Sequence, residues 1–359
     1  MTAFRRTRLT GQRIRVLVVD DSVVIRRLVT HALEDDRDIE IAGTASNGAI
    51  ALARIPQLNP DVLTLDVEMP EMDGLETLRR IRRDFRDLRV VMFSTMTERG
   101  ADITFEALAL GADDYVTKAS NEGSLDQSLH RLREDLIPKI KQFFTLPASA
   151  PLPVSHLRKP VRLPPAASAA VVGIGVSTGG PTALAALLPQ IPADFPLPIL
   201  IVQHMPPMFT RLLAERLDHT CPLRVHEARD GDLVEPGHIF IAPGDFHMRV
   251  ERKPEGVRLR LDQGPQLNSC RPAVDALFLS MAEVYGGAVT AVILTGMGRD
   301  GCRGAEVLKS HGAWLIAQDE ASSVVWGMPG AVTAAGLPDR ILPLGEIPAA
   351  IAQEAACPR

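Results

Sequence analysis

The sequence predicts an α/β protein built from two doubly wound parallel-sheet domains. Short apolar runs alternate with segments of helical period along much of the chain. Val, Leu, Ile and Ala are plentiful while aromatic residues make up 4%, a composition typical of strands buried on both faces of a parallel sheet. A chain of 359 residues is long enough for two ordinary cores, so we expect two domains.

The first domain is predicted from five βα units. Five short runs rich in β-forming residues are each followed by a segment of helical period, and such units form a parallel sheet with right-handed crossovers. The last helix carries one apolar stripe, and Pro138 is expected to kink it. The strand runs are RVLVVD (15–20), DIEIAG (38–43), DVLTLD (61–66), RVVMFS (89–94) and DDYVTK (113–118), and the stripe comprises Leu125, Leu129, Leu132, Leu136, Ile140 and Phe143.

A linker is predicted at residues 145–168. This stretch, TLPASAPLPVSHLRKPVRLPPAAS, is rich in Pro, Ala and Ser and has no periodic apolar face. We therefore expect the first domain to span 13–144 and the second 169–355.

The second domain is predicted to be a larger α/β unit. Its apolar runs are too short for helices, and helical segments lie between several of them. These runs are AAVVGIGVS (169–177), PILIVQH (198–204), HIFIAP (238–243) and AVTAVILTGMG (288–298).

Charge and hydropathy exclude some classes of protein. A net charge of -5 argues against a large nucleic-acid footprint, and no apolar run approaches the length of a membrane span. The basic N-terminal stretch lacks the longer apolar region of a signal peptide. The four cysteines match no metal or disulfide spacing, so we expect the protein to reside in the reducing cytoplasm. The oligomeric state is not predicted.

Polar side chains close four of the strands in the first domain: Asp20 and Asp21, Asp66, Ser94, and Lys118. Functional groups of a doubly wound sheet gather beyond the carboxyl ends of its strands. Three close carboxylates repel one another unless a hard cation such as Mg²⁺ lies among them. An aspartate at a strand end is often only a turn former or helix cap, but the whole set favours a site.

The motifs VLVVDDS, LDVEMPEMDG, VVMFST and DDYVTK resemble the receiver domain of two-component response regulators, over residues 14 to 144. The resemblance implies a flavodoxin-like fold, and it implies a CheA-type histidine kinase as phosphodonor. It also implies that Asp66 accepts a phosphoryl group, that Asp20, Asp21, Asp66 and the backbone of Glu68 bind Mg²⁺, and that Ser94 and Lys118 sense the phosphate.

One residue departs from the receiver pattern. Ala119 follows Lys118, where the family usually has a proline with a cis peptide. A cis bond to a non-proline residue costs roughly 2.5 to 4 kcal/mol. We therefore expect either a retained strain or a different loop at Lys118.

The glycine-rich stretch VVGIGVSTGGPT opens the second domain. It has no lysine, so it is not a Walker phosphate loop. It matches a dinucleotide loop only loosely, because one residue too many precedes the third glycine. Gly175-Val176-Ser177-Thr178-Gly179 fits the Gly-x-Ser-x-Gly pattern, in which small residues form a sharp turn and expose a nucleophilic serine.

A serine nucleophile needs a base and an orienting acid. His204 is the histidine at the end of an apolar strand, and Asp300 follows another strand after a glycine-rich turn. If the three strands are parallel neighbours, Ser177, His204 and Asp300 converge at one sheet edge. Each also has a plainer interpretation, as a helix cap or, for His204, as a half-buried imidazole.

Six motifs, in order, resemble the catalytic domain of the CheB family of chemotaxis protein-glutamate methylesterases. They are GVSTGGP, VQHMP, IAPGDFHM, RPAVDALF, LTGMGRDG and AQDEASSVVWGMPG, over about 170 to 345. The resemblance implies a Rossmann-like fold with Ser177 as nucleophile, His204 as general base and Asp300 as orienting acid. The backbone N–H of Met297 is a candidate for the oxyanion hole. Cys270 and Ala273 stand where the family often has His and Ser, and we expect these departures to affect packing or substrate contacts and not the triad.

This resemblance implies a substrate and a form of regulation. The substrate is a glutamyl γ-methyl ester on the cytoplasmic helices of a chemoreceptor, and the same attack on an amide would deamidate glutamine. Ester hydrolysis is expected to need no cofactor, whereas receiver phosphorylation needs Mg²⁺. We expect the unphosphorylated receiver to dock over the Ser177 cleft.

Two other classes compete with this interpretation. A dinucleotide-dependent oxidoreductase would need an acidic residue at a second strand end, but Asp194 lies ahead of its strand. A response regulator with a nucleic-acid-binding output domain would need a basic helix to read the bases. The net negative charge of the chain argues against this class.

Overall fold

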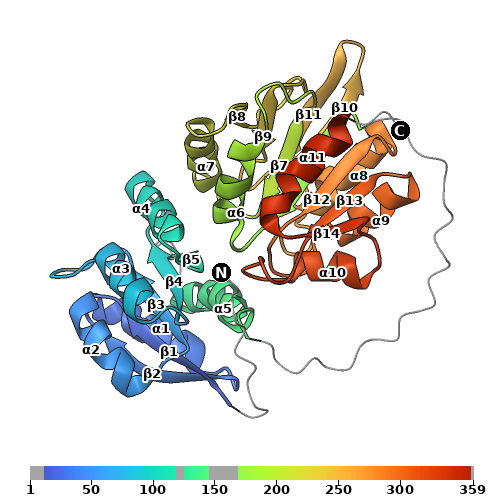
Figure 1. Ribbon diagram of the computed structural model, residues 1–359. Helices are drawn as coiled ribbons and strands as arrows, with labels where there is room; N and C mark the ends of the chain where they lie inside the picture. Colours follow the sequence, from blue (N-terminus) through green and yellow to red (C-terminus); the bar gives the residue numbers. More distant parts are fainter. Residues whose placement is uncertain (1–11, 119–124, 145–168, 357–359) are drawn as a thin grey trace. The chain divides into compact units, whose positions relative to one another are not determined.

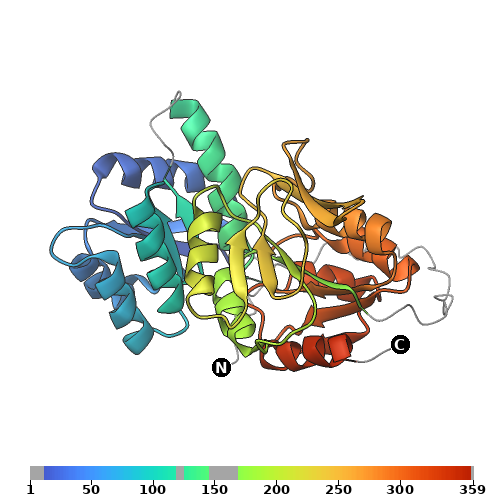
Figure 2. The same cartoon turned by 90° about the horizontal axis from the view of Figure 1, so that it is seen from above.

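The computed structural model describes residues 12–118, 125–144 and 169–356. The chain divides into two compact units, and the division falls within the predicted linker (Figure 1 and Figure 2). The linker prediction itself, at 145–168, lies outside the described residues. In the part that is described, no helix has the length and apolar character needed to cross a membrane.

The first unit alternates strands and helices. In chain order its elements are β1 (Ile14–Val19), α1 (Val23–Glu34), β2 (Ile39–Ala45), α2 (Gly48–Leu58), β3 (Val62–Asp66), α3 (Gly74–Asp84), β4 (Arg89–Ser94), α4 (Glu98–Ala109), β5 (Asp114–Thr117) and α5 (Leu125–Lys141).

All five predicted strands of this unit are present in one parallel sheet, of order β2-β1-β3-β4-β5. Helices α1 and α5 pack together, and α2, α3 and α4 pack side by side. This order and connectivity is the doubly wound arrangement that the alternating pattern predicts.

The predicted apolar stripe is largely confirmed, although Phe143 lies two residues beyond the end of α5. Leu132, Leu136, Ile140 and Phe143 are buried, with exposures of 6% or less. Pro138 lies inside the helix. The side chain of Leu125 is outside the described residues, and Leu129 is half-buried.

The second unit is a seven-stranded parallel sheet with a hairpin. Its strands are β6 (Val171–Val176), β7 (Ile199–Gln203), β8 (Arg224–Glu227), β9 (His238–Ile241), β10 (His247–Lys253), β11 (Gly256–Asp262), β12 (Val289–Ile293), β13 (Trp314–Gln318) and β14 (Arg340–Leu342). Its helices are α6 (Gly180–Leu187), α7 (Phe209–Asp218), α8 (Val274–Tyr285), α9 (Cys302–Ser310), α10 (Met328–Ala334) and α11 (Ile347–Ala356), with short 3₁₀ turns η1 (Leu188–Gln190) and η2 (Leu344–Glu346).

The strand order is β14-β13-β12-β6-β7-β9-β8, and the antiparallel pair β10-β11 stands apart from it (Figure 1). Helices α8, α9 and α10 contact the strands β12, β13 and β6, and the core on this side also takes in apolar residues of the hairpin. The four predicted strands correspond to β6, β7, β9 and β12. The strands β8, β10, β11, β13 and β14 are additional.

The central strands determine where the site lies. β12, β6 and β7 are adjacent and parallel, as the convergence of the three candidate residues requires. Val176 pairs with Gln203, and Gly175 pairs with Ile293, so the three strands end at one level. The residues that follow them therefore meet at one edge of the sheet.

Candidate active site and acidic cluster

Ser177 lies at a sharp turn between β6 and α6. Its N–H donates to Thr295 O at 3.0 Å, and its carbonyl accepts from Gly180 N at 2.8 Å. Gly179 adopts φ +77°, whereas Ser177 has no positive φ. The unusual backbone conformation of the turn therefore falls on a glycine, which adopts it without the Cβ penalty.

The glycines beside Ser177 are required by close packing. A Cβ on Gly175 would lie 2.5 Å from Val274 Cγ1, and a Cβ on Gly180 would lie 1.9 Å from Gln203 Oε1. Close packing therefore accounts for the glycine-rich sequence as a tight turn that presents a serine.

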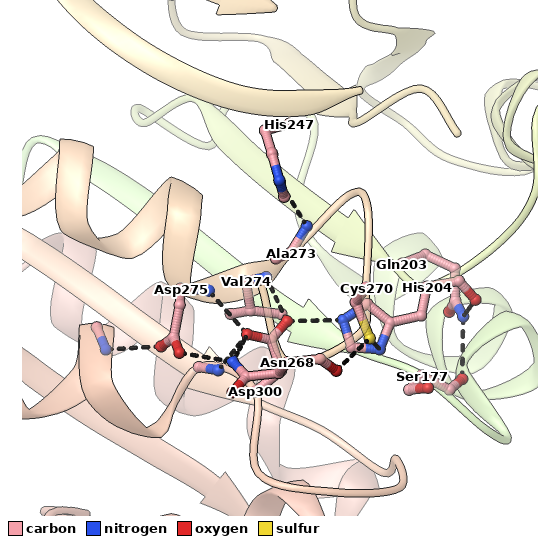
Figure 3. Close-up of polar contacts among 12 residues, drawn as sticks. Ser177, Gln203, His204, His247, Asn268, Cys270, Ala273, Val274, Asp275 and Asp300 are labelled. Carbon is pink, nitrogen blue, oxygen red and sulfur yellow. Dashed lines mark hydrogen bonds and ion pairs between the residues drawn. The ribbon is translucent and has the colours of Figure 1, made fainter. Parts of the chain in front are cut away.

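Gln203 holds the turn and the next strand end together. Its Nε2 donates to Ser177 O at 3.0 Å and to His204 O at 3.1 Å (Figure 3). The side chain is buried. Sequence reasoning missed this residue, although a polar residue at the end of the apolar run ILIVQ was a signal.

Asp300 and His204 form a direct pair. His204 Nε2 lies 2.8 Å from Asp300 Oδ2, and Asp300 is 2% exposed (Figure 3). Burial alone raises the pKa of Asp300, but the contact with His204 and the surrounding donors lower it below its usual value. The structure therefore holds Asp300 as a carboxylate beside the imidazole.

Several donors fix the Asp300 carboxylate. Val274 N and Asp275 N, in the first turn of α8, donate to it at 2.6 and 3.2 Å, and Gly301 N donates at 3.0 Å. Asn268 Nδ2 donates at 2.8 Å. Asp300 therefore caps α8 as well as pairing with His204. Asn268 was missed, and no sequence pattern pointed to it.

The structure brings Ser177 to the same sheet edge as His204, but no hydrogen bond within the described residues joins the Ser177 hydroxyl to the imidazole (Figure 3). His204 Nδ1, the nitrogen not engaged by Asp300, instead lies 3.6 Å from Cys270 Sγ. The expectation that Cys270 stands apart from the triad is therefore wrong, because its loop returns to the imidazole.

The other two positions singled out from the sequence lie near this edge. Met297 is 39% exposed, and among residues 169–356 its N–H donates no hydrogen bond. Ala273 precedes α8 and offers no side-chain cap, and its N–H donates to His247 Nδ1 at 3.2 Å. Asp300 supplies the cap that a serine at position 273 would otherwise provide.

Gly296→Ala is expected to slow any reaction that uses Ser177 as nucleophile by about a hundredfold, because displacing a reacting group by about 1 Å costs that much. A Cβ on Gly296 would lie 2.7 Å from Ser177 Cβ and 2.6 Å from Met328 Sδ. Gly345→Ala is the matched control, since no atom lies within 4 Å of its Cβ position. The measurement is the rate of covalent labelling of Ser177 by a serine-directed reagent, in purified variants of equal thermal stability. An unchanged labelling rate in Gly296→Ala would show that Ser177 tolerates displacement.

The first unit carries an acidic cluster at its own sheet edge. Lys118 Nζ lies 2.7 Å from Asp66 Oδ2 and 3.0 Å from Asp20 Oδ2. Burial, above all, and the charge of Asp20 raise the pKa of Asp66 to about 6, although Lys118 acts in the opposite direction. Burial lowers the pKa of Lys118, but the ion pairs with Asp66 and Asp20 raise it by more.

These residues fit a divalent cation. Carboxylate oxygens of Asp20, Asp21 and Asp66 lie within 4.8 Å of one another. A hard cation would offset both the burial of the Asp66 charge and its repulsion by Asp20, which together raise the pKa of Asp66. Lys118 reaches the cluster although Ala119 follows it, and Ala119 itself lies outside the described residues.

Ser94 and Glu68, the other two predicted members of this site, do not direct their side chains at the carboxylates. Ser94 is fully buried at the end of β4, and its hydroxyl donates to Gly100 O at 2.9 Å instead of facing the carboxylates. Glu68 N donates to Asp66 Oδ1 at 3.4 Å, and the Glu68 side chain is exposed beside Arg99. Ser94 would therefore have to leave Gly100 in order to contact a phosphate on Asp66.

Comparison with known proteins gives the family. The family model described as CheB methylesterase matches residues 172–351, and the response regulator receiver domain model matches residues 16–130. A protein-glutamate methylesterase/protein-glutamine glutaminase of Trichodesmium erythraeum is 50% identical over 93% of this chain and 97% of its own. The chain belongs to the CheB methylesterase family. A relative of the same name from Nocardioides sp. is 51% identical over 93% of each chain.

A solved structure supports the fold assigned to this CheB family member. The catalytic domain of Thermotoga maritima CheB methylesterase is 47% identical and aligns with a TM-score of 0.51, covering 52% of this chain and 98% of that chain. Family membership removes the oxidoreductase and nucleic-acid-binding alternatives. Asp194 indeed lies ahead of β7, away from the strand ends that a dinucleotide site would use.

Proposed function

We propose that the protein is a phosphorylation-regulated serine esterase that hydrolyses glutamate γ-methyl esters on chemoreceptors to glutamate and methanol. The observation that carries this proposal is the placement of Ser177 beside the His204–Asp300 pair, beyond three adjacent parallel strands. The relatives named above carry the corresponding activity in their names.

The geometry supports a separate role for each imidazole nitrogen. Asp300 engages Nε2 of His204, so Nδ1 is the atom that takes the Ser177 proton. The hydroxyl oxygen attacks the ester carbonyl, and the Met297 N–H stabilises the developing oxyanion. His204 returns the proton to methanol, and a water activated in the same way then hydrolyses the glutamyl-enzyme. These steps use only side chains, backbone and water.

The same site is proposed to deamidate receptor glutamines. Attack on a side-chain amide forms the same glutamyl-enzyme, with ammonia in place of methanol as the leaving group. The names of the relatives include protein-glutamine glutaminase.

The receiver is proposed to regulate this site through Asp66. Asp20, Asp21, Asp66 and the Glu68 backbone would hold Mg²⁺, which supplies charge neutralisation for phosphoryl transfer from a CheA-type histidine kinase. Phosphorylation gives Asp66 nearly two negative charges at neutral pH, for which Lys118 is the adjacent cation. We place the receiver at 13–144, the linker at 145–168 and the esterase at 169–355, and we propose a cytoplasmic location.

The direct test is methanol release from a methylated chemoreceptor fragment. We expect release by the intact protein, and faster release when a small-molecule phosphodonor and Mg²⁺ are added. The same fragment with glutamine at the modified positions reports deamidation through ammonia. No methanol from the methylated fragment, under conditions where the protein is folded, would contradict the proposal.

Methanol release is also expected to depend on pH through His204, which acts as a base only when neutral. Burial, the largest single effect, lowers the pKa of His204, but the contacts with Asp300 and Cys270 together raise it by more, so activity should rise with pH about a midpoint above that of free imidazole. Asp300→Asn removes the charge, so the midpoint should move to lower pH while the maximal rate falls by about 10⁴-fold. A pH–rate profile of both proteins checks this, and an unchanged midpoint would contradict it.

A further inference from the structure

The Cys270 thiol lies against the proposed general base. Cys270 Sγ is 3.6 Å from His204 Nδ1, and His204 Nε2 is 2.8 Å from Asp300 Oδ2 (Figure 3). Thiol, imidazole and carboxylate thus form a continuous chain of contacts. The nitrogen that the thiol faces is the one that the proposed mechanism assigns to the Ser177 proton, so the two residues compete for it.

A structured turn places this thiol. Leu267 and Cys270 exchange backbone hydrogen bonds of 3.1 and 2.8 Å, and the two residues between them, Asn268 and Ser269, have φ of 51° and 61°. Positive φ at both central residues is typical of a tight type I′ turn. Asn268 Nδ2 ties the turn to Asp300 at 2.8 Å. The position of Cys270 is therefore set by the same network that holds the triad acid.

The trio is poorly suited to a metal ion. Ligand atoms of His204, Cys270 and Asp300 lie within 4.8 Å of one another, but Asp300 already bonds Nε2 of the imidazole and Cys270 faces Nδ1, so the two side chains approach different nitrogens of the ring. Asp300 also accepts hydrogen bonds from Val274, Asp275, Gly301 and Asn268. The arrangement favours thiol chemistry over metal binding.

A thiol beside an imidazole can pass its proton to the ring and react as a thiolate. Burial lowers the pKa of His204, while the bonds with Asp300 and Cys270 raise it by more, so the protonated ring is favoured. Cys270 is also partly exposed. Of the other described thiols, Cys221 has its pKa raised by burial to about 11, and Cys302 is buried with its pKa raised by burial.

We propose that Cys270 is an oxidant-sensitive site whose reaction with a hydroperoxide switches the esterase off, an inference that rests on the proposed role of His204. The thiolate sulfur attacks one peroxide oxygen, so an S–O bond forms and the O–O bond breaks. With hydrogen peroxide, hydroxide leaves and takes the proton of His204 to become water. Sulfur is oxidised to sulfenic acid and the peroxide is reduced. The added oxygen then lies between Cys270 and Nδ1 and keeps the Ser177 proton from the base.

The first test measures methanol release after treatment with hydrogen peroxide. We expect activity to fall by about tenfold or more as Cys270 is converted to a sulfenic acid that dimedone labels. Dithiothreitol should restore both the activity and the thiol. Cys270→Ala should keep its own activity under the same treatment. Cys221→Ala is the matched control and should lose activity as the intact protein does. Equal loss in Cys270→Ala, or inactivation without modification of Cys270, would overturn the proposal.

A second test does not depend on esterase activity. The rate of iodoacetamide alkylation of Cys270 at neutral pH, followed by peptide mass spectrometry, should fall by about tenfold in His204→Asn because the thiolate loses its cationic partner. An unchanged alkylation rate would overturn the inference whatever the esterase does. If instead Ser177→Ala kept full esterase activity while this labelling behaved as expected, the proposed function would be the part that fails.

Discussion

Ser177→Ala is expected to reduce methanol release from a methylated receptor fragment by about 10⁴-fold or more, because loss of a nucleophile removes the covalent route entirely. The variant should fold normally, since the Ser177 contacts that hold the turn are made by its backbone N–H and carbonyl, which bond Thr295, Gly180 and Gln203. A steady-state assay at micromolar enzyme concentration, from which the rate of uncatalysed hydrolysis is subtracted, measures the residual rate.

Ser310→Ala is the matched control for this variant. Ser310 is an exposed serine of α9 whose hydroxyl, within residues 169–356, bonds Val307 of its own helix and the adjacent His311. It should retain the activity of the intact protein. A Ser177→Ala variant that kept more than about a tenth of the rate would rule out Ser177 as nucleophile.

Asp66→Asn is expected to abolish the stimulation of methanol release by a phosphodonor and Mg²⁺. The amide lacks the carboxylate oxygen that attacks phosphorus, and it removes one of the three carboxylates that fit the cation. Lys118 keeps its ion pair with Asp20, so the fold of the receiver should persist. Paired measurements with and without phosphodonor give the result.

Asp87→Asn serves as the control, because Asp87 is exposed in the turn between α3 and β4, away from the acidic cluster. It should respond to the phosphodonor as the intact protein does. Stimulation that survived in Asp66→Asn would show that phosphorylation at Asp66 is not the regulatory event.

The sequence predicted the strands that carry the chemistry because they are buried on both faces. Runs such as ILIVQ and VTAVI are almost entirely apolar, a signal that needs no tertiary information. Ser177, His204 and Asp300 can converge at one edge only if β12, β6 and β7 are neighbours. The sequence did not predict that strand order, and the structure shows it.

Some contacts at the site were not predicted because they are made by loops that are distant in sequence and fold back to the site. Asn268, and the contact of Cys270 with His204, depend on a turn about 65 residues beyond His204 in sequence, and neither residue belongs to a periodic pattern. The rotamer of Ser94, directed to Gly100, is likewise set by packing against α4. Short strands such as β14, with three residues, carry too little pattern to be recognised.

The most direct measurement is the location of a fluorophosphonate label, a reagent that traps activated serine nucleophiles. Peptide mass spectrometry should find the label on Ser177, in step with loss of methanol release, and His204→Asn should slow the labelling because the base is gone. A label on Cys270 or another residue at full inactivation would contradict the account, as would a fully labelled Ser177 in an enzyme that still turns over.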